Sequence, residues 1–144
     1  MKIVLTVFIV FMNQIMWCEV VKAPLISAQE LETEIKSNHL RRHPWNTKFI
    51  VVNVLSKRVS IDCRIPGSVN VPVHKLATTF RSWSKDTNIV LYCAGLSCPL
   101  SNYAFDALRK LGFTNVRVFD GGLRTWKGNN FPTIGLCKAG YLQG

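Results

Sequence analysis

Three short apolar runs rich in β-branched residues most constrain the fold: Phe49–Leu55, Asn88–Tyr92 and Val116–Phe119. Runs of this kind are typical of strands buried on both faces. Segments with helical periodicity separate them, including one that begins near Cys98 and ends at Gly112. The alternation predicts an α/β domain with a mainly parallel, twisted sheet of about five strands and helices on both faces.

The N-terminal segment differs from the rest of the chain. Lys2 precedes an apolar run, Ile3–Met12, that is shorter than the roughly twenty residues a membrane span needs. We therefore predict a signal peptide over residues 1–23, a domain over 24–134 and a C-terminal tail over 135–144. The protein is then exported, to a periplasm or outside the cell. In the alternative, the segment is not cleaved and provides the chain's membrane contact.

Basic residues give the chain a formal net charge of +10 at pH 7. Such a charge attracts anions, which include small substrates, acidic proteins and anionic lipid surfaces. The basic residues occur in pairs, such as Arg41-Arg42 and Lys57-Arg58, without the aromatic-interleaved stripe of many nucleic-acid-binding proteins. The pattern argues against a nucleic-acid partner, and a basic surface exposed to solvent is the alternative to an anion-binding one.

Cys93 directly follows the predicted strand 88–92 and precedes the predicted helix. In parallel α/β sheets the active site lies beyond the carboxyl ends of the strands. Backbone N–H groups and the helix dipole favour an anion at this place, and they lower the pKa of a cysteine there. The position predicts a nucleophilic thiolate; the alternative is a cysteine packed in the core. The residues expected to form an anion cradle around it are Ala94, Gly95, Leu96, Ser97 and Cys98.

Several motifs surround Cys93 in a fixed order. Ile65-Pro66-Gly67-Ser68-Val69-Asn70-Val71-Pro72 lies upstream, and Asp120-Gly121-Gly122 with Trp126 and then Phe131-Pro132 lies downstream. Over residues 25–134 this arrangement resembles the single-domain rhodanese family. The resemblance implies a rhodanese-like three-layer fold and a sulfurtransferase that forms a persulfide on Cys93. A small anionic sulfur donor or a protein persulfide would load it, and a thiol or another thiophilic acceptor would unload it. No metal or organic cofactor is implied.

The sequence departs from this family's pattern at three places. Asn53 and Leu55 stand where an Asp and an Arg are usual, Arg64 replaces a His, and the loop ends in Cys98 instead of Arg. The longer loop resembles a subgroup with a Cys-x4-Cys loop. Without a guanidinium in the loop, a dianion cannot be held bidentately there, so we expect Arg64 to contribute to substrate binding. Thiosulfate is then a poorer donor than polysulfide or a persulfide. The same absence argues against a phosphatase.

The remaining cysteines leave alternatives open. Cys98 is interpreted as a resolving thiol, as the partner of a resting disulfide with Cys93, or as a packing residue. Cys63 is interpreted as a loop cysteine, with a second redox thiol as the alternative, and Cys137 lies in a tail expected to be disordered. Two functions compete with sulfur transfer: a thiol–disulfide redox protein using Cys93 and Cys98, and a non-catalytic binding module.

Overall fold

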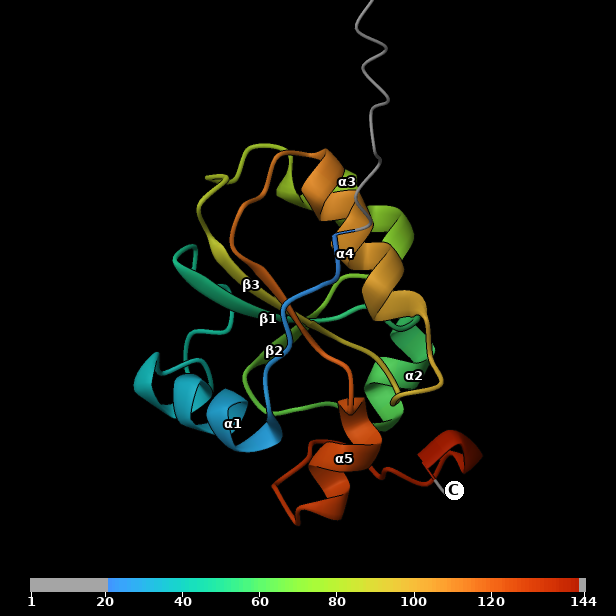
Figure 1. Ribbon diagram of the computed structural model, residues 1–144. Helices are drawn as coiled ribbons and strands as arrows, with labels where there is room; N and C mark the ends of the chain where they lie inside the picture. Colours follow the sequence, from blue (N-terminus) through green and yellow to red (C-terminus); the bar gives the residue numbers. More distant parts are fainter. Residues whose placement is uncertain (1–20, 143–144) are drawn as a thin grey trace, which may run out of the picture.

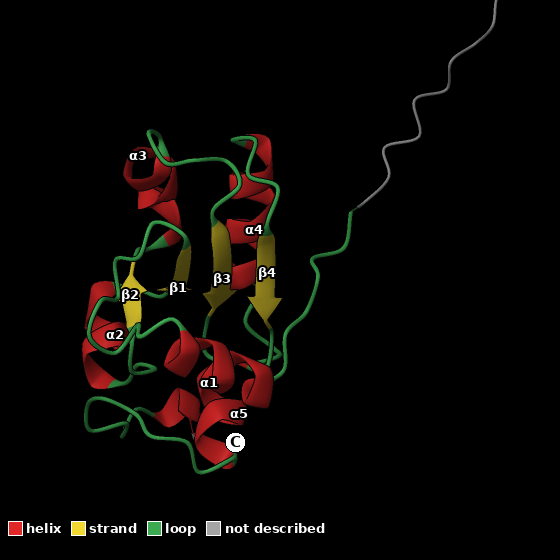
Figure 2. Cartoon of the chain, turned by 90° about the vertical axis from the view of Figure 1, so that its left-hand side faces the viewer, coloured by secondary structure: helices red, strands yellow, loops and turns green. Residues whose placement is uncertain are grey.

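The computed structural model describes residues 21–142 and contains a parallel four-stranded sheet (Figures 1 and 2). The strand order is β2-β1-β3-β4, so the chain crosses over between strands in the way an α/β sheet requires. The bounds are β1 Phe49–Asn53, β2 Ser68–Asn70, β3 Asn88–Tyr92 and β4 Val116–Phe119.

The two central strands carry the core. Every residue of β1 is buried, and β1 pairs in register with β3, so that Val51 lies beside Val90. Burial on both faces explains why these strands are continuous apolar runs. At the β4 edge, Leu25 adds a single parallel bridge to Val118, next to the four strands of the described sheet. The predicted α/β fold with a parallel sheet of about five strands is confirmed.

Helices cover the sheet on both sides. In Figure 2, α3 and α4 lie behind the sheet, with α4 packed on β3 and β4, while α1 and α5 lie in front near the strand ends. The predicted capping box forms at Ser27, whose Oγ accepts from the Glu30 N–H at 3.2 Å. The helix bounds are α1 Ala28–Ser37, α2 Lys57–Asp62, α3 Leu76–Phe80, α4 Leu100–Lys110 and α5 Gly122–Gly128, with 3-10 turns η1 Val73–Lys75 and η2 Gly140–Leu142.

A buried polar network lies at the end of β1 and β3. The hydroxyl of Tyr92 accepts from the N–H of Ile65 at 3.0 Å and from Nδ2 of Asn53 at 3.2 Å, and it lies 2.8 Å from Oγ of Ser68. Burial raises the pKa of Tyr92 to about 12, so it remains a neutral hydrogen-bonding group. Asn53, at the position where the rhodanese pattern has an Asp, is therefore fully buried and used to hold the fold together.

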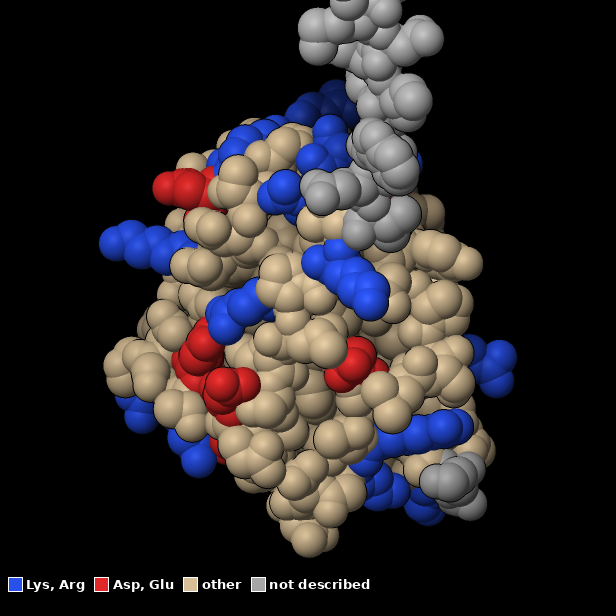
Figure 3. Space-filling view, in the orientation of Figure 1, with Lys and Arg blue, Asp and Glu red and all other residues tan. Residues whose placement is uncertain are grey.

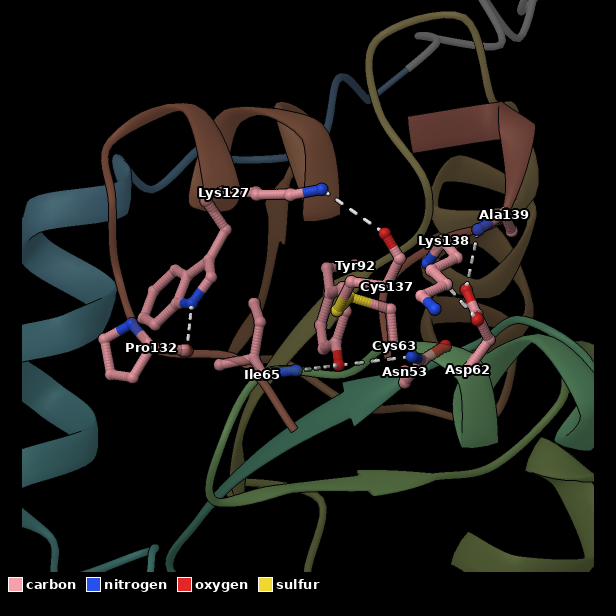
Figure 4. Close-up of a disulfide and its surroundings, with 11 residues drawn as sticks. Asn53, Asp62, Cys63, Ile65, Tyr92, Lys127, Pro132, Cys137, Lys138 and Ala139 are labelled. Atoms are coloured by element: carbon pink, nitrogen blue, oxygen red, sulfur yellow. Dashed lines mark hydrogen bonds between the residues drawn. A yellow bond between two sulfur atoms is a disulfide. The ribbon is translucent and has the colours of Figure 1, made fainter. Parts of the chain in front are cut away.

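The C-terminal tail packs against the domain through a disulfide between Cys63 and Cys137 (Figure 4). The Asp62 carboxylate accepts from the backbone N–H groups of Lys138 and Ala139, at 3.4 and 3.2 Å. The expectation of a disordered tail is therefore wrong as far as residue 142, and Cys63, interpreted as a loop cysteine or a second redox thiol, forms a structural disulfide. The pairing joins cysteines 74 residues apart, and such connectivity does not follow from sequence alone.

Basic residues outnumber acidic ones in this chain, 18 Lys and Arg against 8 Asp and Glu. Figure 3 shows Lys and Arg side chains spread over the visible face, with fewer Asp and Glu between them. Among the helices of residues 21–142, none is both long and apolar enough to cross a membrane. Most of the predicted signal peptide over 1–23 lies outside the described residues, so that prediction stays open.

Candidate active site

Cys93 comes directly after β3, and its side chain is turned into the loop that leads to α4. Its residue exposure is 0%, and its Sγ lies 3.2 Å from the carbonyl oxygen of Cys98 and 3.9 Å from that of Gly95. The Oγ of Ser101, in the first turn of α4, lies 3.4 Å from the same sulfur. The thiol is thus enclosed by the loop and the start of the helix.

Burial raises the pKa of the Cys93 thiol above its ordinary value. Hydrogen bonds from Ser101 act in the opposite direction, and the side chain of Cys98 adds to the increase. The lowered pKa expected from the sequence is therefore wrong for this conformation. The physical reason is that the sulfur is buried away from water, which disfavours the charged thiolate more than the hydrogen bonds from Ser101 favour it.

The loop nevertheless holds a set of unused backbone donors. The N–H of Cys98 donates to the carbonyl of Gly95 at 2.9 Å, inside the loop. The backbone N–H groups of the other four loop residues make no hydrogen bond with any described residue. These residues are Ala94, Gly95, Leu96 and Ser97, which were predicted to form an anion cradle together with Cys98. The structure gathers them in one loop, and their binding role stays a prediction.

The Gly-Gly motif at the start of α5 packs against this loop. The N–H of Leu123 donates to the carbonyl of Cys93 at 3.1 Å, and the N–H of Arg124 donates to that of Ala94 at 3.0 Å. Gly122 has a φ of +55°, and a Cβ placed there would lie 2.7 Å from the backbone N of Gly95. Only glycine permits this close approach, so the motif fixes the loop that carries Cys93.

We predict that Gly122→Ala lowers the free energy of unfolding by about 3 kcal/mol, because it combines an unfavourable φ with overpacking. It should also displace the loop and so change the rate at which Cys93 reacts. Urea denaturation and the rate of Cys93 alkylation measure the two effects. Gly128→Ala is the matched control, because a Cβ there meets nothing within 4 Å. Equal stability of the two variants would contradict the packing role.

Cys98 is half-buried and, like Cys93, a free thiol. It lies at the C-terminal end of the loop, close enough for its side chain to influence the pKa of Cys93. The structure therefore brings together the two cysteines predicted as catalytic, in the reduced state. Which of the three roles Cys98 has stays open.

Arg64, the predicted substrate-binding cation, is half-buried and lies beside the tail. Its backbone pairs with Ile134 through hydrogen bonds of 3.0 and 2.9 Å. It lines a hollow of about 300 Å³ together with Lys57, Ser60, Ile61, Ser68 and Asn70. Cys93 is not among the residues that line this hollow. A role for Arg64 at the thiol therefore stays a prediction.

Two residues that lie at the site, Ser101 and Arg124, were not predicted from the sequence. Ser101 contacts the sulfur directly, and Arg124 lies against the loop, with its Cδ 3.2 Å from the position a Cβ on Gly95 would occupy. Ser101 could have been predicted, because it is a serine in the first turn of the helix that follows Cys93. Arg124 was recognisable only by its position two residues after Gly122.

The fold and the loop are those of a known class of domain. The family model of the rhodanese-like domain matches residues 27–129, and the chain belongs to this family. The structure is similar to that of the BH2092 protein from Bacillus halodurans, with a TM-score of 0.67 and 26% identity over 80% of this chain and 79% of that one.

Two other similarities concern parts of longer proteins. The structure of a thiosulfate sulfurtransferase from Pseudomonas aeruginosa shares the fold, with a TM-score of 0.64 and 20% identity over 78% of this chain and 20% of that one. The HTH-type transcriptional regulator Rv0324 of Mycobacterium tuberculosis is 32% identical over 77 residues, 54% of this chain. The match spans about a third of that regulator, 34%.

Proposed function

We propose that this protein is a sulfurtransferase that carries sulfane sulfur as a persulfide on Cys93. The observation that carries the proposal is the position of a free thiol at the end of β3, inside a loop with four unused N–H groups. Membership of the rhodanese-like family, which includes sulfurtransferases, supports it. Unused donors of this kind stabilise negative charge on a bound donor or on a persulfide.

The reaction has two steps. The Cys93 thiolate attacks the sulfane sulfur of the donor, an S–S bond forms, and the donor's own bond to that sulfur breaks. With thiosulfate, sulfite leaves with the electron pair. A thiolate or cyanide then attacks the outer sulfur, and the Cys93 thiolate is released. Both steps use only the Cys93 thiolate, the donor, the acceptor and the loop, without a metal or an organic cofactor.

The donor we favour is polysulfide or a protein persulfide. The loop resembles the Cys-x4-Cys subgroup, and residues 94–108 contain no Lys or Arg that could hold a small dianion. The acceptor is a thiol, free or on a partner protein. Two alternatives have observations in their favour. The neighbouring free thiol of Cys98 fits a redox pair, and the burial of Cys93 fits a binding module without turnover.

We also propose that the protein works in an oxidising compartment outside the cytoplasm. The buried disulfide between Cys63 and Cys137 supports this, because structural disulfides persist mainly in exported proteins. The signal peptide predicted over residues 1–23 agrees with that location, and membrane contact would come only from this segment.

A discontinuous assay tests the function. The native protein is supplied with polysulfide or thiosulfate as donor and with cyanide as acceptor, and the thiocyanate formed is measured. We expect turnover with polysulfide and slower turnover with thiosulfate. The absence of thiocyanate above the uncatalysed background with both donors would exclude sulfur transfer to cyanide and favour the alternatives.

The reaction should become faster as the pH rises. Because burial raises the pKa of Cys93, only a small fraction is thiolate at neutral pH. We expect the rate of persulfide formation to increase about tenfold per pH unit below that pKa and to continue rising above pH 8. Stopped-flow or quenched mass analysis at constant ionic strength measures it. A plateau that begins below pH 7 would show a lowered pKa and contradict the expectation.

A further inference from the structure

Arg124 is the cation that packs against the loop carrying Cys93. Its backbone N–H donates to the carbonyl of Ala94, and its Cδ lies next to Gly95. The side chain is exposed, so its charged end reaches solvent beside the loop. Because residues 94–108 contain no Lys or Arg, the loop itself offers backbone donors but no charge.

The guanidinium of Arg124 is held in place from the other side by the tail. Its Nε donates to the carbonyl oxygen of Tyr141 at 2.6 Å. No hydrogen bond or ion pair between described residues uses its two terminal nitrogens, so their N–H groups remain available. A guanidinium fixed at one edge and free at the other is preorganised to bind an anion.

The tail that holds Arg124 is itself anchored at several points, which Figure 4 shows. The disulfide joins Cys137 to Cys63, the Asp62 carboxylate binds the next two backbone N–H groups, and Lys127 donates to the carbonyl of Cys137 at 3.3 Å. These contacts place the 3-10 turn η2, and with it the carbonyl that orients Arg124. Arg64 and Lys57, by contrast, line the hollow that does not include Cys93.

We infer that Arg124 is a specificity-determining residue that favours anionic sulfur donors at Cys93, and that the disulfide-anchored tail positions it. The inference rests on the proposed function, because it names the charge of the substrate for that site. Arg124 supplies the positive charge and the forked donors that the loop lacks, while the loop N–H groups supply the remaining hydrogen bonds. Neutral reagents gain nothing from the guanidinium.

The test compares an anionic and a neutral alkylating reagent at Cys93. Iodoacetate and iodoacetamide both form a thioether by displacing iodide, and tandem mass spectrometry separates modification of Cys93 from that of Cys98. We expect Arg124→Gln to lower the iodoacetate to iodoacetamide rate ratio about threefold, the size of a solvent-exposed charge interaction. Arg124→Lys should retain part of the preference, since it keeps the charge but loses the fork.

Lys110→Gln is the matched control. It removes the same charge from an exposed side chain at the far end of α4, and no hydrogen bond or ion pair between described residues uses that side chain. We expect its rate ratio to equal that of the unmodified sequence. The inference is overturned if both variants lower the ratio equally, if Arg124→Gln slows both reagents equally, or if neither reagent modifies Cys93.

The result of the alkylation test does not depend on whether the protein transfers sulfur. Alkylation requires only an accessible thiol, so a ratio that depends on Arg124 establishes the anion preference even if no thiocyanate is formed. Conversely, turnover with a ratio that does not depend on Arg124 supports the proposed function and rejects the role of Arg124.

Discussion

Cys93→Ala is expected to abolish sulfur transfer, leaving thiocyanate formation at the uncatalysed background. The persulfide needs a sulfur nucleophile at the end of β3, and alanine offers none. We do not expect Cys98 to take over, because it lies at the C-terminal end of the loop and the four unused N–H groups precede it in the chain. We expect a loss of at least about a thousandfold, measured as thiocyanate formed from polysulfide.

Cys98→Ala is the comparison that separates the alternatives. Sulfur transfer needs only the thiol of Cys93, so this variant should retain turnover within about threefold. A redox pair needs both thiols, and both variants would then be inactive in thiol–disulfide exchange. If Cys98→Ala alone stops sulfur transfer, the mechanism proposed above is wrong. If Cys93→Ala retains full turnover, the reaction does not take place at this site.

Removing the disulfide is expected to lower the free energy of unfolding by about 4 kcal/mol, the value for closing a loop of this length in the chain-entropy treatment. The double variant Cys63→Ala/Cys137→Ala avoids an unpaired thiol. In this double variant the tail can still make its native contacts, but the unfolded chain has a higher conformational entropy because the cross-link is gone. Urea denaturation without reducing agent measures the difference.

Two controls accompany the disulfide variant. Cys98→Ala removes a half-buried thiol that makes no disulfide, and we expect it to change stability by less than about 1 kcal/mol. Adding a reductant to the unmodified protein should reproduce the loss seen in the double variant. If neither the double variant nor the reductant shifts the urea midpoint, the disulfide contributes no stability. Sulfur-transfer assays should accordingly be run without strong reductants.

The central elements of the fold could be predicted because their residues carry unambiguous patterns. β1 and β3 are continuous apolar runs, and α4 shows helical periodicity up to the positive-φ glycine, Gly112. The helix α2, Lys57–Asp62, was not predicted, because six residues are too few to show a period. The edge strand β2 has only three residues, and Val69 is its one apolar side chain.

The position of the site could be predicted, whereas its electrostatics could not. The sequence places Cys93 at a strand end before a helix, and the structure confirms that location. The direction of the Cys93 side chain depends on how α4 and α5 pack around the loop. Because this packing buries the thiol, it raises the pKa of Cys93. The tail gave no sequence signal either, since the pairing of Cys137 depends on contacts across the whole domain.

The most direct measurement is the intact mass of the native protein after a brief pulse of polysulfide or thiosulfate, followed by peptide mapping. We expect one added sulfur atom, located on Cys93 and removed by cyanide. Loss of two hydrogens from Cys93 and Cys98 without sulfur uptake would contradict it and establish the redox pair. A Cys93 that stays an unmodified thiol with both donors would also contradict it and point to a binding module.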